Sequence, residues 1–594
     1  MRLNRRQALG ILGAGAATPA MAAKPAADSD AKFLHGVASG DPLADRLIIW
    51  TRATPADPKQ SVEVSWEVAE DAAFAHVVSK GTKPATPARD HTVKVDVGRL
   101  KPGKEYFYRF KAGDTSPVGR ARTLPTGPTD KVVFAVVTCA HFANGYFNAY
   151  DHIAKLDRVD AVVELGDYIY EYGGKGSFGR DNGDKLGRIP EPDRDIYTLA
   201  DYRTRHAQYK RDPDLQAAHA RCAWICVWDD HETANDSWAG GAENHDPATE
   251  GVWEDREAAA IRAYYEWMPI REPEPGQAFE AINRSFQFGD LASLIMVESR
   301  LLARSYQYEL SRPGDIPVSV FDVHDPDKRV KVSDAGVIAQ VMTAMKAWGA
   351  PPSGYAIAPD VETLNATIAN PERQMLGVHQ EHWLARELET SVKSGKPWQV
   401  LGNQVVMARA MNPNIIEALG VKVVNARLDA MPEAQRKQAR QFVEAMSAAI
   451  PFDLDGWNGY PAARERVYDA IKASGGGNAV VLAGDSHAFW INELYDASGK
   501  TRVAAEFATS SITSPSIGDA AGFQVGDIFA AKNPEVKFCD QLAKGYIVLT
   551  LTRQEARAEL ISVPIDVKPY QAKPLAVWRV KPTAGVGVGP VEKL

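Results

Sequence analysis

Cysteine, excess positive charge and long apolar runs are all scarce in this chain of 594 residues. Four cysteines are far too few for a disulfide-stapled scaffold. A formal net charge of −8 argues against a nucleic-acid-binding protein, which needs a basic surface. Outside the first residues, no apolar run reaches the length of a membrane span. What remains is a typical globular composition, 45% hydrophobic and 24% charged, in a chain long enough for two or more domains.

Two common hydrolase signatures are also missing. The sequence has no Gly-x-Ser-x-Gly elbow and no phosphate-binding P-loop, which disfavours a serine hydrolase and a nucleotide hydrolase. The segment GKGSFG at 174–179 matches the dinucleotide-binding pattern in its letters only. No helix is expected to begin there, so we interpret it as a loop.

The first residues form a predicted export signal. Arg5 and Arg6 precede the weakly apolar stretch ALGILGAGAATPAMA, and small residues around Met21 allow cleavage after Ala22. We therefore assign residues 1–22 to a twin-arginine signal peptide, which exports proteins that have already folded. This predicts a periplasmic or secreted protein that folds before it leaves the cytoplasm.

The remaining chain divides into three predicted parts. Residues 35–125 contain SVEVSWEV, HTVKVDV and KEYFYRF, whose period-two alternation predicts a small fibronectin-like β-sandwich. Within it, Leu100 to Tyr106 resembles a sandwich corner in which a tyrosine hydroxyl bonds to nearby backbone. From 130 to 570, apolar strands alternate with helical patterns, which is typical of an α/β catalytic domain. Residues 571–594 are expected to form an extended tail.

Four apolar runs in the α/β part end at side chains that bind metals. They are VVFAVVTC, AVVELGDYIY, CAWICVWDDHETAN and AVVLAGDSHAFW. Such runs predict buried strands of a sheet that is covered on both faces. Ligands of open α/β sheets gather beyond the carboxyl ends of the strands, so these segments are expected to meet at one metal site.

The donor types indicate which metals. Asp167 follows its strand in a Gly-Asp turn, where its two oxygens can serve two metals about 3.5–4 Å apart. Tyr170 and Cys139 are anionic, electron-rich donors when ionised, and they suit a ferric ion. Asp485 and His487 alternate in an extended chain and can face the same metal pair.

The segment from Trp228 to Asn235 is the richest in donors. Asp230 and His231 can hold a second metal or the phosphate, and Asn235 offers a neutral oxygen. The pattern leaves open which of Asp229 and Asp230 faces the site.

At these residues the sequence resembles the PhoD family of alkaline phosphatases, relatives of the purple acid phosphatases in the metallophosphoesterase superfamily. The segments HGVASGDPLADRLIIWTR, WDDHETAND, DGWNGYPAARERV, GDSHAFWINEL and EFATSSITSPS follow one another as family signatures. The likeness covers residues 35 to 560. It implies an α/β fold of the αββα-sandwich type, preceded by the fibronectin-like domain.

The resemblance also implies one Fe³⁺ and two Ca²⁺ ions. Carried over by motif, iron would be held by Cys139, Asp167, Tyr170 and His487. Calcium and phosphate would be met by Asp167, Asp230, Asn235 and Asp485. His231 would be a catalytic residue beside them, and Arg300 would help to hold the phosphate, although the Asp-Thr-Arg ending of many family members reads Glu-Ser-Arg here.

The expected function is therefore a secreted phosphatase that cleaves phosphate monoesters and diesters through a metal-activated hydroxide. We expect a monomer whose partners are the phosphate ester and the twin-arginine export machinery. Two alternatives stay open. One is a phospholipase D-like phosphodiesterase that uses the same metals. The other is a non-catalytic cell-surface binding protein, which the intact set of ligands disfavours.

Overall fold

The protein is seen in a computed structural model that describes residues 31–594, apart from 310–311, 313, 326–327, 476, 584–586 and scattered positions between 432 and 445. The predicted signal peptide at 1–22 lies outside the described residues. Among the described helices, none is long and apolar enough to cross a membrane.

A ten-stranded sheet forms the first half of the core. Its central strands β9, β10 and β11 are parallel, and each is a short apolar run buried almost throughout, as the sequence predicted. The C-terminal strands continue the sheet on one side, antiparallel to one another. The strands on this side and at the centre are β9 (Lys131–Val137), β10 (Ala161–Glu164), β11 (Ala223–Cys226), β22 (Gly545–Thr552), β23 (Ala556–Ser562), β24 (Lys573–Val580) and β25 (Glu592–Lys593).

A seven-stranded sheet forms the second half. Four of its strands, β13, β17, β18 and β20, are parallel. The strands are β12 (Arg284–Phe288), β13 (Ala292–Met296), β17 (Trp398–Gly402), β18 (Asn478–Ala483), β20 (Arg502–Ala508), β19 (Phe489–Tyr495) and β21 (Val536–Asp540).

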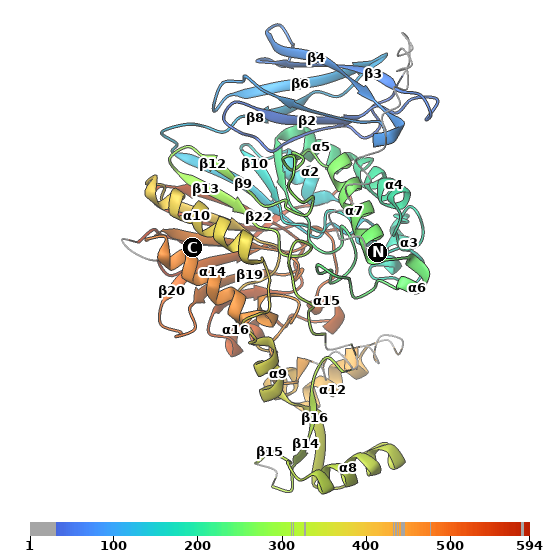
Figure 1. Cartoon of the computed structure of the whole chain (residues 1–594), viewed down its shortest axis with the longest axis vertical. Coiled ribbons are helices and arrows are strands. Elements are labelled where there is room, and N and C mark those ends of the chain that lie inside the picture. Colours follow the sequence, from blue (N-terminus) through green and yellow to red (C-terminus); the bar gives the residue numbers. More distant parts are fainter. Residues whose placement is uncertain are drawn as a thin grey trace.

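The two sheets pack face to face, and helices cover both outer faces (Figure 1). Phe134 of β9 and Phe288 of β12 meet between the sheets with ring centroids 4.9 Å apart. One outer layer contains α2 (Asn148–Ala154), α4 (Leu199–Lys210), α5 (Pro213–Arg221) and α7 (Trp253–Trp267). The other contains α10 (Val378–Lys393) and α14 (Pro461–Ala473). This αββα order confirms the predicted fold class.

The N-terminal all-β part shares a sheet with the body. Strands β1 (Val37–Gly40), β2 (Leu47–Arg52) and β5 (Thr92–Val97) extend the ten-stranded sheet, because β1 pairs in parallel with β11. A second sheet packs over them: β3 (Val62–Ala69), β4 (Val77–Ala85), β6 (Glu105–Ala112), β7 (Asp114–Thr115) and β8 (Gly119–Arg122). The predicted corner is present, since the Lys101 backbone N–H donates to the Tyr106 hydroxyl at 2.8 Å.

Two stretches of the segment predicted as an extended tail at 571–594 are built into the ten-stranded sheet, as strands β24 and β25. Strand β24 pairs with β23, and β25 pairs with β24. Ala576, Trp578 and Val580 point inward in alternation and are buried. This burial holds the strand in place, and the period-two pattern that signals it is visible in the sequence.

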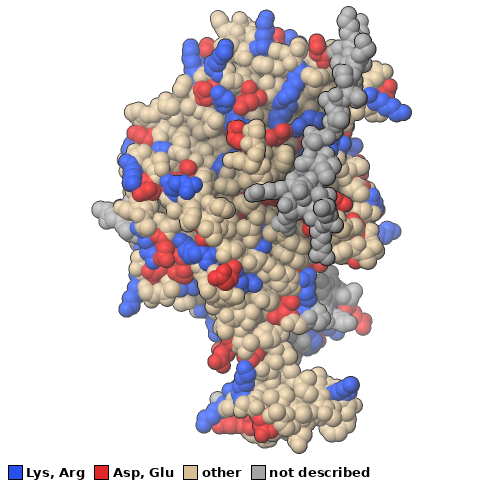
Figure 2. All heavy atoms as spheres, viewed as in Figure 1, with Lys and Arg blue, Asp and Glu red and all other residues tan. Residues whose placement is uncertain are grey.

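The segment that lies between β13 and α10 in the sequence forms a small arm that projects from the lower end of the body (Figure 1). It contains β14 (Val318–Asp322), β15 (Val330–Lys331), α8 (Ala335–Trp348) and β16 (Tyr355–Pro359), followed by α9 (Val361–Ile368). Shorter helices elsewhere are α3 (Arg180–Leu186), α6 (Pro247–Glu250), α11 (Ile415–Leu419), α12 (Val421–Asp429), α15 (Ile517–Ala521) and α16 (Gly526–Lys532). On the face shown in Figure 2, basic and acidic side chains are intermixed over the body.

Candidate metal centre and active site

The predicted donors meet at the carboxyl ends of the parallel strands. Cys139 follows β9, Asp167 and Tyr170 follow β10, and Asp230 and His231 follow β11 in the first sheet. Asp485 and His487 follow β18, and Arg300 follows β13, in the second sheet. The site therefore lies where the strand ends of the two sheets come together. The sequence predicted that these segments meet at one place, but as strands of a single sheet.

Four of these residues adopt a left-handed backbone conformation. The φ angles are +57° at Cys139, +59° at Asp167, +60° at Asp485 and +55° at His487. Residues other than glycine avoid this region, and each such conformation costs on the order of 1–3 kcal/mol. Because this costly conformation recurs at three strand ends that converge, those of β9, β10 and β18, the backbone is arranged to aim these side chains at one point.

The first cluster contains a thiol, a carboxylate and an imidazole. Donor atoms of Cys139, Asp167 and His487 all lie within 4.8 Å of one another. The Tyr170 hydroxyl donates to Asp167 Oδ2 at 2.8 Å and lies 3.1 Å from His487 Nε2. The structure thus brings together all four predicted iron donors. Nδ1 of His487 is engaged by the Pro515 carbonyl at 2.5 Å, which leaves Nε2 to face the cluster.

The second cluster shares a carboxylate with the first. Donor atoms of Asp167, Asp230 and His231 lie within 4.8 Å of one another, and so do those of Asp229, Asp230 and Asp485. Asp167 therefore takes part in both clusters, which is the position that a bridging carboxylate needs. The sequence left open which of Asp229 and Asp230 faces the site. In the structure both of them do.

The electrostatics of this region call for cations. Burial raises the pKa of Asp167 and Asp485 well above the ordinary range, and neighbouring aspartates raise both further. Burial likewise raises the pKa of Asp229 to about 7, against the lowering effect of Arg300. Asp229 Oδ2 and Asp230 Oδ1 are buried and have no hydrogen-bond partner. Oxygen atoms of this kind fit metal ions, which supply the missing positive charge.

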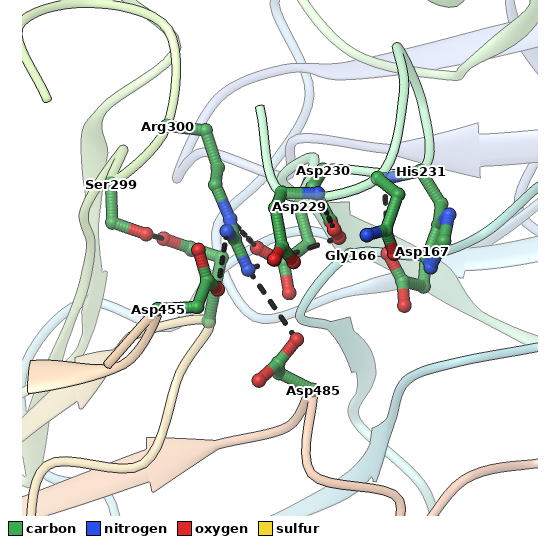
Figure 3. A network of polar contacts seen from close by, with 12 residues as sticks. Gly166, Asp167, Asp229, Asp230, His231, Ser299, Arg300, Asp455 and Asp485 are labelled. Carbon is green, nitrogen blue, oxygen red and sulfur yellow. Dashed lines mark hydrogen bonds and ion pairs between the residues drawn. The ribbon is translucent and has the colours of Figure 1, made fainter. Parts of the chain in front are cut away.

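Arg300 neutralises part of this charge (Figure 3). Its Nε donates to Asp229, Nη1 donates to Asp455 at 2.6 Å, and Nη2 donates to Asp485 at 3.4 Å. The side chain is fully buried. Each guanidinium nitrogen is thus engaged by a carboxylate, so a role in holding phosphate stays a prediction.

His231 and Asn235 are held by other acids. His231 Nδ1 lies 2.6 Å from Glu171 Oε2, which fixes the ring. Burial alone would lower the pKa of His231, but Asp230 and Glu171 outweigh it and raise the pKa well above the usual range. The Asn235 amide nitrogen donates to the Glu243 carboxylate, and its backbone N–H donates to Glu171 at 2.7 Å. The contacts described for Asn235 therefore run to Glu243 and Glu171.

Several supporting residues were missed by the sequence analysis. Glu232 accepts hydrogen bonds from the backbone N–H groups of Tyr168, Asp229 and Asp167, at 2.5, 2.8 and 3.1 Å. Ser514 donates to the Tyr170 hydroxyl at 2.7 Å. Lys544 is buried and forms an ion pair with Asp519 at 2.7 Å. Burial is the largest cause that lowers the pKa of His487, and the positive charge of Lys544 is the second. Glu171 follows the predicted donor Tyr170, Glu232 follows His231, and Asp455 begins the family segment DGWNGYP. Their places in the sequence could therefore have marked them as candidate site residues.

Comparison with known proteins agrees with this geometry. The family model described as "PhoD-like phosphatase" matches residues 134–560, and that described as "PhoD-like phosphatase, N-terminal domain" matches residues 18–125. Alkaline phosphatase D of Bacillus subtilis (strain 168) is 34% identical over 553 residues, covering 91% of this chain and 79% of that protein.

A solved structure gives the same result. It is described as "Structure of PhoD", is 31% identical, and matches with a TM-score of 0.71 over 96% of this chain and 93% of the other. The matches span both the β-sandwich and the αββα body, and they include every strand end described above. The chain therefore belongs to the PhoD-like phosphatase family and is a phosphoric ester hydrolase.

Proposed function

We propose that this protein is an exported alkaline phosphatase that cleaves phosphate monoesters and diesters with one ferric ion and two calcium ions. The observation that carries the proposal is the shared position of Asp167, between a Cys-Tyr-His cluster and a cluster of aspartates. Two adjacent groups of different donors suit two different metals. The name of the relative Alkaline phosphatase D supports the alkaline range.

Iron fits the first cluster because of its donors. Burial raises the pKa of both Cys139 and Tyr170 well above the usual range, so neither would ionise readily without a strong cation. A trivalent ion stabilises a thiolate and a phenolate together, whereas calcium prefers oxygen ligands. Calcium fits the second cluster, where Asp167, Asp230 and Asp485 supply carboxylate oxygens. Asn235 stays a predicted calcium ligand.

When bound, the metals would draw charge from the phosphoryl oxygens and lower the pKa of a water molecule. The protein supplies the orientation. Glu171 holds His231 by Nδ1, which leaves Nε2 to donate to a phosphoryl oxygen or to the leaving group. Glu232 fixes the turns of Asp167 and Asp229 through backbone N–H groups. Arg300 donates to Asp229 and Asp485 and lowers the pKa of both, which offsets part of the effect of burial.

The two alternatives, a phospholipase D-like phosphodiesterase and a non-catalytic binding protein, require different properties of the site. A phospholipase D-like phosphodiesterase would use the same residues on another ester, so only substrate tests separate it. A non-catalytic binding protein is disfavoured by the phosphatase family to which the chain belongs. Export through the twin-arginine machinery is supported by Arg5 and Arg6 and the apolar stretch after them.

The test is to replace the shared carboxylate. Asp167→Asn keeps the side-chain size and removes the charge that both clusters use. We expect purified Asp167→Asn to contain less iron and less calcium than wild type, and to lose hydrolysis of p-nitrophenyl phosphate and of its bis ester. Asp157→Asn is the matched control, because Asp157 is exposed and follows α2, before β10 begins. If Asp167→Asn keeps both metals and its activity, the proposed sharing is wrong.

A further inference from the structure

A third group of carboxylates lies beside the two clusters. It consists of Asp236, Glu243 and Glu309, and one oxygen of each lies within 4.8 Å of the others. Asp236 and Glu243 belong to the segment after β11, and Glu309 comes from the segment after β13. Two stretches that are distant in sequence therefore bring three acids to one point, outside the residues assigned to iron and calcium above.

Glu309 is the member whose environment demands an explanation. The residue is only 7% exposed, and both carboxylate oxygens are buried with no hydrogen-bond partner. Burial and the neighbouring Glu243 raise the pKa of Glu309 to about 8. Among the described residues, Arg312 is the cation paired with it, since Arg312 Nη2 lies 3.3 Å from Glu309 Oε1. Glu309 is thus a buried carboxylate that lies beside two half-buried ones, Asp236 and Glu243.

The geometry fits a hard divalent cation. Calcium binds oxygens at about 2.3–2.6 Å, so two oxygens on one ion are separated by at most about 5.2 Å. The three carboxylates satisfy this limit. Asn235 donates its amide nitrogen to Glu243 and so orients one donor. The φ of +51° at Asp236 turns the backbone sharply at another.

We propose that Asp236, Glu243 and Glu309 bind a divalent cation of the calcium type, separate from the catalytic metals. The ion would hold the segment after β11 in place. Asp236 donates its backbone N–H to Asp230 Oδ2 at 2.6 Å, and Gln307 donates its amide to the Asp236 carbonyl. The site therefore connects directly to a proposed catalytic ligand. Its role is positioning: it fixes the loop that orients Asp230.

The experiment counts calcium ions in the full-length protein. Holo-protein is stripped with a chelator that leaves iron in place, and calcium is titrated into wild type and Glu309→Gln by calorimetry. We expect Glu309→Gln to bind one equivalent fewer while its iron content stays unchanged. We also expect calcium to raise the melting temperature of wild type by more than that of the variant. Glu389→Gln, an exposed change in α10, is the control and should match wild type.

Two outcomes would overturn the proposal: an equal number of calcium ions in wild type and Glu309→Gln, or an equal effect of calcium on their melting temperatures. Either result would mean that the three acids share a proton or rely on Arg312. If Glu309→Gln does not fold, Glu243→Gln and Asp236→Asn carry the same test with the same expected loss. If the proposed catalytic metals are wrong, the wild-type protein will contain no iron. If only the third carboxylate site is wrong, wild type will contain iron but will not differ from the variants in calcium binding.

Discussion

Replacement of Glu232 by glutamine tests how the site is held together. Glu232 Oε1 accepts the Tyr168 N–H, and Oε2 accepts those of Asp167 and Asp229. Glutamine has the same shape, but its amide nitrogen must face at least one of these donors. The cheaper orientation places the nitrogen toward Tyr168 and leaves one buried N–H unsatisfied, which costs about 1–3 kcal/mol. The two remaining bonds lose their charge-assisted character, at about 0.5 kcal/mol each.

We therefore expect Glu232→Gln to lower the free energy of unfolding by about 2–4 kcal/mol. Burial raises the pKa of Glu232 to about 8, so the comparison is made at a pH above that value, where the carboxylate is ionised. Denaturant titration of wild type and variant, each stripped of metal, then measures this difference without a contribution from bound ions. Because two of the three N–H groups belong to Asp167 and Asp229, the variant should also retain less metal after dialysis. Glu389→Gln serves again as the exposed control. A loss below about 1 kcal/mol would refute the view that Glu232 fixes these turns.

Three further predictions concern export, calcium and substrate. Lysine at both Arg5 and Arg6 should leave activity in the cytoplasm, and normal periplasmic activity in a fractionation assay would contradict twin-arginine export. Chelation should abolish hydrolysis while iron stays bound, and calcium should restore it. Recovery with zinc or magnesium but not with calcium would mean that the divalent assignment is wrong. The catalytic efficiency on bis-p-nitrophenyl phosphate should at least equal that on p-nitrophenyl phosphate, because a diester carries less charge to neutralise. The buried Lys544 near the iron cluster adds positive charge, so a strong monoester preference would identify it as the group to replace first.

The strand ends could be predicted from sequence because the strand and its metal donor are both marked within one short stretch of chain. An apolar run followed at once by Asp, Cys or His marks a buried strand and its donor in one stretch, as at Cys139 and Asp167. The corner at Tyr106 was equally readable. Strand β24 could have been found, since Ala576, Trp578 and Val580 alternate with more exposed residues.

Other features depend on partners that are distant in sequence. Arg300 contacts Asp229, Asp455 and Asp485, and no local pattern encodes those pairs, while its predicted role in holding phosphate stays a prediction. The same holds for β1, whose pairing with β11 joins the N-terminal strands to the main sheet. The third carboxylate group combines residues from two segments, so it too becomes visible only in the folded chain.

The most direct test of the central claim is the iron content and visible spectrum of wild type and Tyr170→Phe. A phenolate and a thiolate on ferric iron should give the wild-type protein a charge-transfer colour and about one iron per chain. The Tyr170 hydroxyl lies 2.8 Å from Asp167 and 3.1 Å from His487, so phenylalanine removes one donor and leaves the rest of the cluster in place. We predict a shifted or bleached band in Tyr170→Phe. A colourless, iron-free wild-type protein with full activity would contradict the account.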